Sequence, residues 1–153
     1  MRATSQIQSG YALLRAIFLC SLLSLGALSA NAHQGATGIV KERMDKFSEA
    51  RQQMRQMRQT LTDLNAIAQT SQDMLSWAQD MKEAFPEGSD GAPSEAAPAI
   101  WTDRAGFNLK IDAYYEAILS LNQAALSGDQ DGTLAAYKAV GARCQSCHQS
   151  YRR

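Results

Sequence analysis

The sequence is poor in the residues that build disulfide scaffolds and β-sheets. It contains three cysteines, two histidines and three prolines, and no strand-like alternation of apolar and polar residues is visible. Basic residues do not form runs or patches with aromatic residues, which argues against nucleic-acid binding. No internal repeat is present, and the only low-complexity stretch is a loop rich in alanine, proline and glycine. These absences favour an all-α fold.

The most specific motif lies near the C-terminus and reads Cys144-Gln145-Ser146-Cys147-His148. On a helix, positions i, i+3 and i+4 share one face, so both thiols and the imidazole converge on one bound group. This spacing is the attachment motif of c-type haem. The sequence therefore predicts one covalent haem c, with Cys144 and Cys147 as attachment points and His148 as the axial iron ligand.

Other uses of the same residues fit less well. A zinc site needs further ligands at matching spacing, and the second histidine, His33, is far away in the sequence. A thioredoxin-like pair needs a βαβ context, and a disulfide between residues three apart is awkward on a helix. His33 with a free α-amine has the donors to chelate copper, but no second histidine lies near it.

The N-terminus has the pattern of a secretory signal peptide. Arg2 and Arg15 are its only charges, the apolar run 16–28 follows, and Ala30-Asn31-Ala32 is a small-residue cleavage site. The run is too short for a membrane anchor, and Cys20 lacks the small residues that precede a lipoprotein cysteine. We therefore expect residues 1–32 to be cleaved and a periplasmic domain, residues 33–153, to remain.

Apolar periodicity predicts four helices in that domain, at 38 to about 58, 62 to about 84, 98 to about 127, and from 129 or 131 to about 151. Thr60 or Thr62 is the expected N-cap of the second helix. In the first helix, Val40, Phe47 and Met54 repeat every seven residues, which predicts a stripe that faces a partner. Helices of this length with short connections favour a four-helix bundle.

Several segments carry a family resemblance. They are Arg43 in the first helix, Phe85-Pro86-Glu87-Gly88 after the second, Ile100-Trp101 at the start of the third, and Val140 to Arg152 around the motif. With these, the chain resembles cytochrome c′, the class II c-type cytochromes, although the connection between its first two helices is shorter. The resemblance implies an antiparallel up-down-up-down bundle with covalent haem c.

The resemblance also assigns residues around the haem. It implies that the first helix faces the haem opposite His148, with Arg43 beside a propionate, Met44 at the haem edge and Phe47 toward the distal iron. It places Glu95 in a loop that approaches the haem. Arg152 lies one turn beyond His148, so we expect it near the proximal iron face, and an ordinary cation that stabilises a helix C-terminus is the alternative. An ordinary solvated helix surface is the alternative for Arg43.

Phe47 decides the expected coordination. Low-spin relatives have a methionine at this position, whereas phenylalanine has no lone pair to donate, so we expect a five-coordinate iron with an apolar distal side. The alternative is ligation by Met44, Met54 or Met57 from the same helix, although methionines at helical spacing more often pack in a core.

Two functions follow from these expectations. The first is electron transfer with soluble or membrane-bound redox partners, and the second is binding of nitric oxide or carbon monoxide at the open iron. An enzyme of the peroxidase type is not expected, because the first helix offers no distal general base. Family members also often dimerise through the first two helices, so a homodimer using residues such as Met54, Met57 and Leu64 is expected.

Overall fold

The computed structural model describes residues 35–153 of the chain. They form five helices: α2 (Gly38–Gln59), α3 (Leu64–Asp80), the short α4 (Ala99–Thr102), α5 (Arg104–Leu126) and α6 (Gln130–Tyr151). The expected signal peptide, Cys20 and His33 lie outside the described residues. No helix between residues 35 and 153 is long and apolar enough to cross a membrane.

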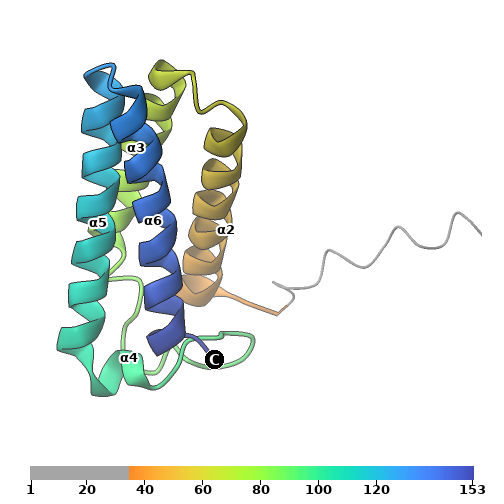
Figure 1. Ribbon diagram of the computed structural model, residues 1–153. Helices are drawn as coiled ribbons and strands as arrows, with labels where there is room; N and C mark the ends of the chain where they lie inside the picture. Colours follow the sequence, from red (N-terminus) through yellow and green to blue (C-terminus); the bar gives the residue numbers. More distant parts are fainter. Residues whose placement is uncertain (1–34) are drawn as a thin grey trace, which may run out of the picture. The chain divides into compact units, whose positions relative to one another are not determined.

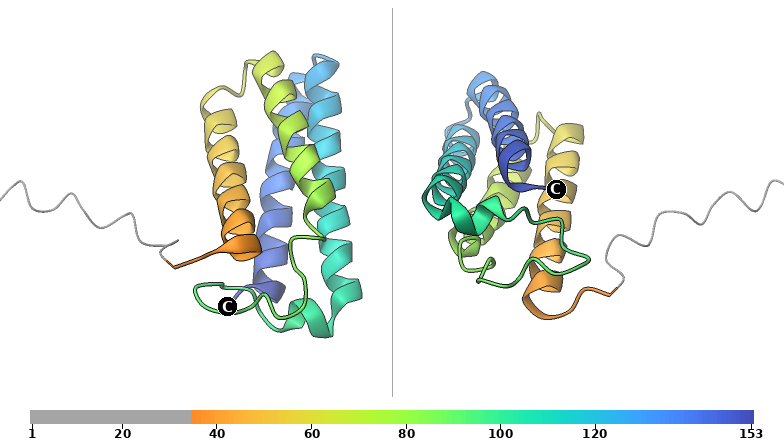
Figure 2. Two further views of the ribbon diagram at one scale, coloured as in Figure 1. Left: turned by 180° about the vertical axis from the view of Figure 1, so that it is seen from behind. Right: turned by 90° about the horizontal axis from the view of Figure 1, so that it is seen from below.

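The four long helices run alternately up and down, which confirms the predicted antiparallel four-helix bundle (Figure 1). The chain rises through α2, descends through α3, turns at α4, rises through α5 and descends through α6 to the C-terminus. Seen from behind and from below, α2 packs beside α3, and α5 lies between α3 and α6 (Figure 2).

Three aspartates start the long helices after α2. Asp63, Asp103 and Asp129 each accept a hydrogen bond from the amide three residues later, on Ala66 (3.0 Å), Gly106 (3.1 Å) and Gly132 (2.9 Å). The predicted caps Thr60 and Thr62 are therefore wrong, and α3 begins after Asp63. At Gly106 a Cβ would collide with the Asp103 carboxylate, so a glycine suits this first turn.

Two predicted helix boundaries are also wrong. The second helix ends at Asp80 rather than near Ala84, because the Glu83 and Ala84 amides bond only three residues back, to the Asp80 (3.1 Å) and Met81 (3.2 Å) carbonyls. Arg104 donates to the carbonyls of Lys82 (2.6 Å) and Phe85 (2.9 Å). The third helix is divided into α4 and α5 at Asp103, whose non-helical backbone (φ −123°, ψ 56°) and capping carboxylate start α5 afresh.

The apolar core lies mainly between α3, α5 and α6. Its fully buried side chains come from all three helices, and they are Ile67, Met74, Ile111, Ile118, Leu121 and Val140. Within this core the Asn122 amide donates to the Ala68 carbonyl (2.8 Å) and to the Ser71 hydroxyl (3.0 Å), so α5 is joined to α3 by a satisfied polar pair.

The stripe predicted on the first helix is only half correct. Arg43, Ala50 and Met57 are the buried residues of α2, whereas Phe47 is 36% exposed and Val40 and Met54 are partly buried. Phe47 and Met54 line a cavity, and Met54 also packs against the edge of the core. Because Met57 is only 2% exposed, it is also unavailable as the dimer contact that we expected.

Candidate functional site

A cavity of about 230 Å³ lies between α2 and α6, with further walls from α5 and from the loop that precedes α4. It contains every residue that the sequence assigned to the haem site, namely Arg43, Met44, Phe47, Glu95, Cys144, Cys147 and His148. These side chains come from two helices and a loop that are about fifty to one hundred residues apart in the sequence. The fold therefore brings the proposed attachment residues and the proposed distal residues to one place.

The thiols and the imidazole lie on the α6 wall of the cavity. Cys144 and Cys147 are partly buried and form no disulfide, and His148 is exposed at the surface of the helix. Burial raises the pKa of both thiols, although for Cys147 the nearby Lys110 ammonium opposes this effect. Burial, together with the Arg152 guanidinium, lowers the pKa of His148, so the neutral imidazole is favoured.

The opposite wall is formed by α2 and is apolar near its centre. Met44, Phe47 and Met54 line it, and Phe47 is held by two other rings. The Phe47 ring meets Trp77 edge-on at a centroid distance of 5.5 Å and lies 6.2 Å from Phe85. Met57 does not contribute to the cavity, which leaves Met44 and Met54 as the methionines of α2 that do.

Arg43 is buried rather than solvated. Only 3% of it is exposed, and its guanidinium donates to the Ala84 carbonyl (3.1 Å), to both the carbonyl and the hydroxyl of Ser89, and to the Ser94 hydroxyl (2.8 Å). The guanidinium also stacks on the Phe85 ring, 4.6 Å from its centroid. Burial lowers the pKa of Arg43, and the Asp90 carboxylate opposes that effect. Arg43 thus ties α2 to the loop that closes one end of the cavity.

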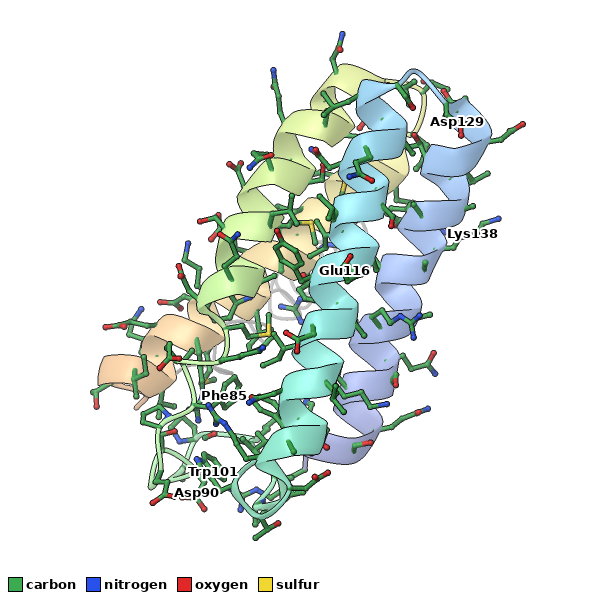
Figure 3. The ribbon with its side chains drawn as sticks, turned by 90° about the vertical axis from the view of Figure 1, so that its left-hand side faces the viewer. Phe85, Asp90, Trp101, Glu116, Asp129 and Lys138 are labelled. Carbon is green, nitrogen blue, oxygen red and sulfur yellow. The ribbon has the colours of Figure 1, made fainter. Side chains whose placement is uncertain are left out.

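That loop is gathered at the end of the bundle where α3 ends, and Phe85, Asp90 and Trp101 all lie there (Figure 3). The Trp101 indole donates to the carbonyls of Phe85 (3.2 Å) and Pro86 (3.0 Å), which fixes the end of α3 against α4.

The C-terminus of α6 is also bound to the loop. The Arg152 guanidinium forms an ion pair with Glu95, and the Arg153 amide donates to the Glu95 carbonyl (2.8 Å). The Ala97 amide donates in turn to the Tyr151 carbonyl (3.0 Å). Glu95 therefore holds its place at the cavity through Arg152, four residues after His148.

Sequence reasoning missed other residues of the cavity. Lys110 donates to the Ser146 hydroxyl (2.7 Å) inside the motif, and Tyr151, Arg51 and Arg143 also line the cavity. Arg143 directly precedes Cys144, which is a local signal for its position. No local signal distinguishes Lys110, because its place depends on how α5 packs against α6.

Comparison with known proteins identifies the family. A family model described as cytochrome C′ matches residues 38–152, which is nearly the whole described part of the chain. The chain belongs to the cytochrome c′ family. Members of this family are four-helix bundles that carry a covalent haem c.

Individual relatives agree with this assignment. The chain is 42% identical over 79 residues to the cytochrome c′ of Alcaligenes xylosoxydans xylosoxydans, a stretch that covers 52% of this chain and 57% of that protein. It is 32% identical over 97 residues to the cytochrome c′ of Rhodospirillum rubrum, covering 63% and 66% of the two chains. The alignments thus span less than two thirds of the length of these curated relatives.

Solved structures of the family superpose well. The structure of a nitric oxide complex of a variant of cytochrome c prime from Alcaligenes xylosoxidans matches with a TM-score of 0.69 and 30% identity. The match covers 75% of this chain and 93% of that one.

The residues of the cavity suit the haem c of the cytochrome c′ family. Two neutral thiols and a neutral imidazole are present on one helix face, and they open into a space with apolar walls. Thiols at this spacing are available for thioether bonds to the vinyl groups, and a neutral imidazole has the lone pair that binds iron.

Proposed function

We propose that this protein is a periplasmic electron-transfer cytochrome with one covalent haem c. Residues 1–32 would direct its export, and residues 33–153 would form the haem-binding bundle. Its redox partners would be soluble or membrane-bound proteins. The observation that carries the proposal is the common cavity that joins Cys144, Cys147 and His148 on α6 to Phe47 on α2.

Each residue has a separate part in this function. Cys144 and Cys147 would hold the haem by thioether bonds, and His148 would bind the iron from α6. When bound, the haem supplies one-electron chemistry between its ferric and ferrous states. Arg43 would meet a propionate from the buried end of the cavity, with Met44 at the haem edge and Glu95 held nearby by Arg152.

The α2 wall supports a five-coordinate iron. Phe47 projects no lone pair into the cavity, and its contacts with Trp77 and Phe85 oppose a rotation that would bring another side chain in its place. Met44 and Met54 are the competing ligands, and both lie on the same wall. Since α2 contributes neither a carboxylate nor an imidazole to the described lining, peroxidase chemistry lacks its distal base.

Binding of nitric oxide or carbon monoxide is the second candidate function. Its support is the apolar wall around Phe47, which favours small neutral ligands over anions and water. The nitric oxide complex of a variant of the Alcaligenes xylosoxidans protein shows that this gas binds to a variant of a relative with the same fold. An iron with an open position is compatible with both functions.

The attachment is tested by extracting the purified exported protein with acid acetone. The pigment should stay with the protein, and the Cys144→Ser/Cys147→Ser double variant should lose it. Ser146→Ala is the matched control, because it changes the motif but leaves both thiols. Release of the pigment from the wild-type protein would contradict the proposal.

Spectra of the same protein then separate the two functions. Reversible oxidation and reduction of the haem supports electron transfer, and a spectral change when nitric oxide is added to the ferrous protein supports gas binding. If nitric oxide causes no change, electron transfer alone remains.

A further inference from the structure

Cationic side chains surround the cavity between α2 and α6. Arg51 comes from α2, Lys110 from α5, and Arg143 and Arg152 from α6, and all four line the cavity. Of these four cations, Arg152 alone forms an ion pair with another described residue, Glu95. Lys110 donates to a hydroxyl, and Arg51 and Arg143 have no carboxylate partner in the described structure. Three positive charges at this opening thus have no carboxylate partner between residues 35 and 153.

The positive surface continues along both helices. Arg55 and Arg58 follow Arg51 at helical spacing and are exposed. Residues 50–62 contain no aspartate or glutamate, and neither do residues 132–153. We call Arg51, Arg55, Arg58, Lys110 and Arg143 the basic rim. The chain as a whole has equal numbers of acidic and basic residues. The positive charge of the basic rim therefore comes from where the basic residues are placed and not from an excess of them.

The carboxylates are gathered on the other side of α2. A shallow groove between α2 and α3 is lined by five acidic residues and two cations. The acidic residues are Glu42, Asp45, Glu49, Asp80 and Glu83. One cation, Arg43, is buried in the loop network, and the other, Lys46, pairs with Glu49. The two sides of α2 therefore carry opposite charge, so a charged partner would be attracted to one side and repelled from the other.

We propose that the basic rim docks an acidic redox protein, so that the partner approaches the haem edge at the cavity. The proposal rests on the electron-transfer function proposed above. Complementary charge around a redox centre speeds encounter and orients the partner without requiring tight binding.

A protein partner fits this surface better than an anionic membrane. The exposed positions between residues 51 and 59 are arginine and glutamine, whereas a membrane-binding helix alternates its cations with large apolar side chains. Leu109 and Leu126 are the most exposed large apolar residues of the described structure, and both lie on α5 rather than on α2.

The test measures electron transfer from a reduced acidic [2Fe–2S] ferredoxin to the ferric holoprotein by stopped flow, at low and at physiological ionic strength. The wild-type rate should fall as salt is added. The Arg55→Glu/Arg58→Glu double variant changes two exposed rim cations outside the cavity lining. It should be slower at low salt by about tenfold, since steering of this kind changes rates by roughly ten- to a thousandfold. Lys41→Glu/Lys46→Glu makes the same charge change elsewhere on α2 and should stay within about twofold of wild type.

A neutral reductant, the lumiflavin semiquinone, separates this proposal from the proposed function. It should reduce all variants at the same rate. If it fails to reduce the wild-type haem, the electron-transfer function is wrong. If it succeeds while the ferredoxin rate is insensitive to salt and to the rim variant, only the docking surface is wrong.

Two further results would also overturn the docking surface. One is a changed visible spectrum or reduction potential in the rim variant, which would assign these cations to the haem itself. The other is salt-sensitive binding to phosphatidylglycerol vesicles, lost in the rim variant, with ferredoxin rates unaffected. That result would assign the rim to a membrane surface.

Discussion

The Tyr151 hydroxyl donates a 2.7 Å hydrogen bond to the Asp103 carboxylate, and the other oxygen of this carboxylate accepts the Gly106 amide at 3.1 Å. Asp103 therefore serves two helices at once, because it caps the first turn of α5 and holds the last turn of α6. Tyr151 is buried against Phe107 and also lines the cavity, so this pair fixes the end of the helix that carries the haem motif.

The pair predicts a pH dependence of stability. The Tyr151 hydrogen bond and the Gly106 amide lower the pKa of Asp103 below its ordinary value of 3.8. The stability that the ionised carboxylate contributes to the fold is therefore complete above pH 3.8 and is lost as the pH falls below it. The hydrogen bond to the Asp103 carboxylate raises the pKa of Tyr151 from 10.0 to about 12. The stability that the neutral Tyr151 hydroxyl contributes is therefore complete below pH 10.0 and is lost as the pH rises toward 12.

Tyr151→Phe tests this dependence. The difference in the free energy of unfolding between wild type and variant should be constant near neutral pH and should shrink toward both extremes, as measured by urea unfolding of the holoprotein. Tyr137→Phe is the control, since its hydroxyl donates to the Met54 carbonyl (3.0 Å), which does not titrate. A difference for Tyr151→Phe that is constant down to acid pH would exclude the coupling.

Arg43→Met should destabilise the fold strongly. The substitution keeps a similar apolar stem but leaves the Ala84 and Ser89 carbonyls buried without a donor, at a cost of about 2–4 kcal/mol. Urea unfolding should show a lower midpoint at an unchanged slope. Arg55→Met removes an exposed arginine from the same helix and should change the stability by less than about 0.5 kcal/mol. Equal effects of the two substitutions would argue against the Arg43 network.

Phe47→Met should convert the iron to six-coordination. The thioether would supply the distal ligand that phenylalanine lacks, and the ferric protein should gain a methionine–iron charge-transfer band in the near infrared. Phe47→Leu changes the shape of the same wall without adding a ligand and should keep the high-spin spectrum. The same band in the wild-type protein would mean that Met44 or Met54 already binds the iron.

Asp63→Ala should weaken α3 by about 1 kcal/mol, because the Ala66 amide loses its capping oxygen. Thr62→Ala should change the stability by less than about 0.5 kcal/mol, since this exposed threonine has no capping bond in the structure. Thermal unfolding of both variants measures the difference. A larger effect of Thr62→Ala would show that α3 begins one residue earlier than it does in the structure.

Local sequence patterns were sufficient for the bundle and for the motif on α6. Helical periodicity marked the four long segments, and Asp129, which caps the last one, was one of the two aspartates predicted to start it. The spacing of Cys144, Cys147 and His148 is itself a helical spacing, so their shared face followed directly from the sequence. Their chemical roles stay predictions until the haem is examined.

The features that the sequence did not predict correctly share a physical cause, because each depends on contacts with residues far away in the sequence. Arg43 is a charged residue at a buried position, and its acceptors lie more than forty residues later, in a loop without a regular pattern. The break at Asp103 involves a carboxylate that caps α5 locally and also accepts a hydrogen bond from Tyr151, 48 residues later. On α2, the apolar stripe of Phe47 and Met54 borders a cavity, so hydrophobic periodicity indicated a site wall as readily as a core.

The position of Phe47 on the cavity wall separates ligand chemistry from folding. Its ring lines the cavity and is not among the fully buried side chains of the core, so exchanging it for another apolar residue should leave most of the bundle's stability intact. A substitution at this one position would therefore change whether the iron keeps an open coordination site, while the architecture around it persists.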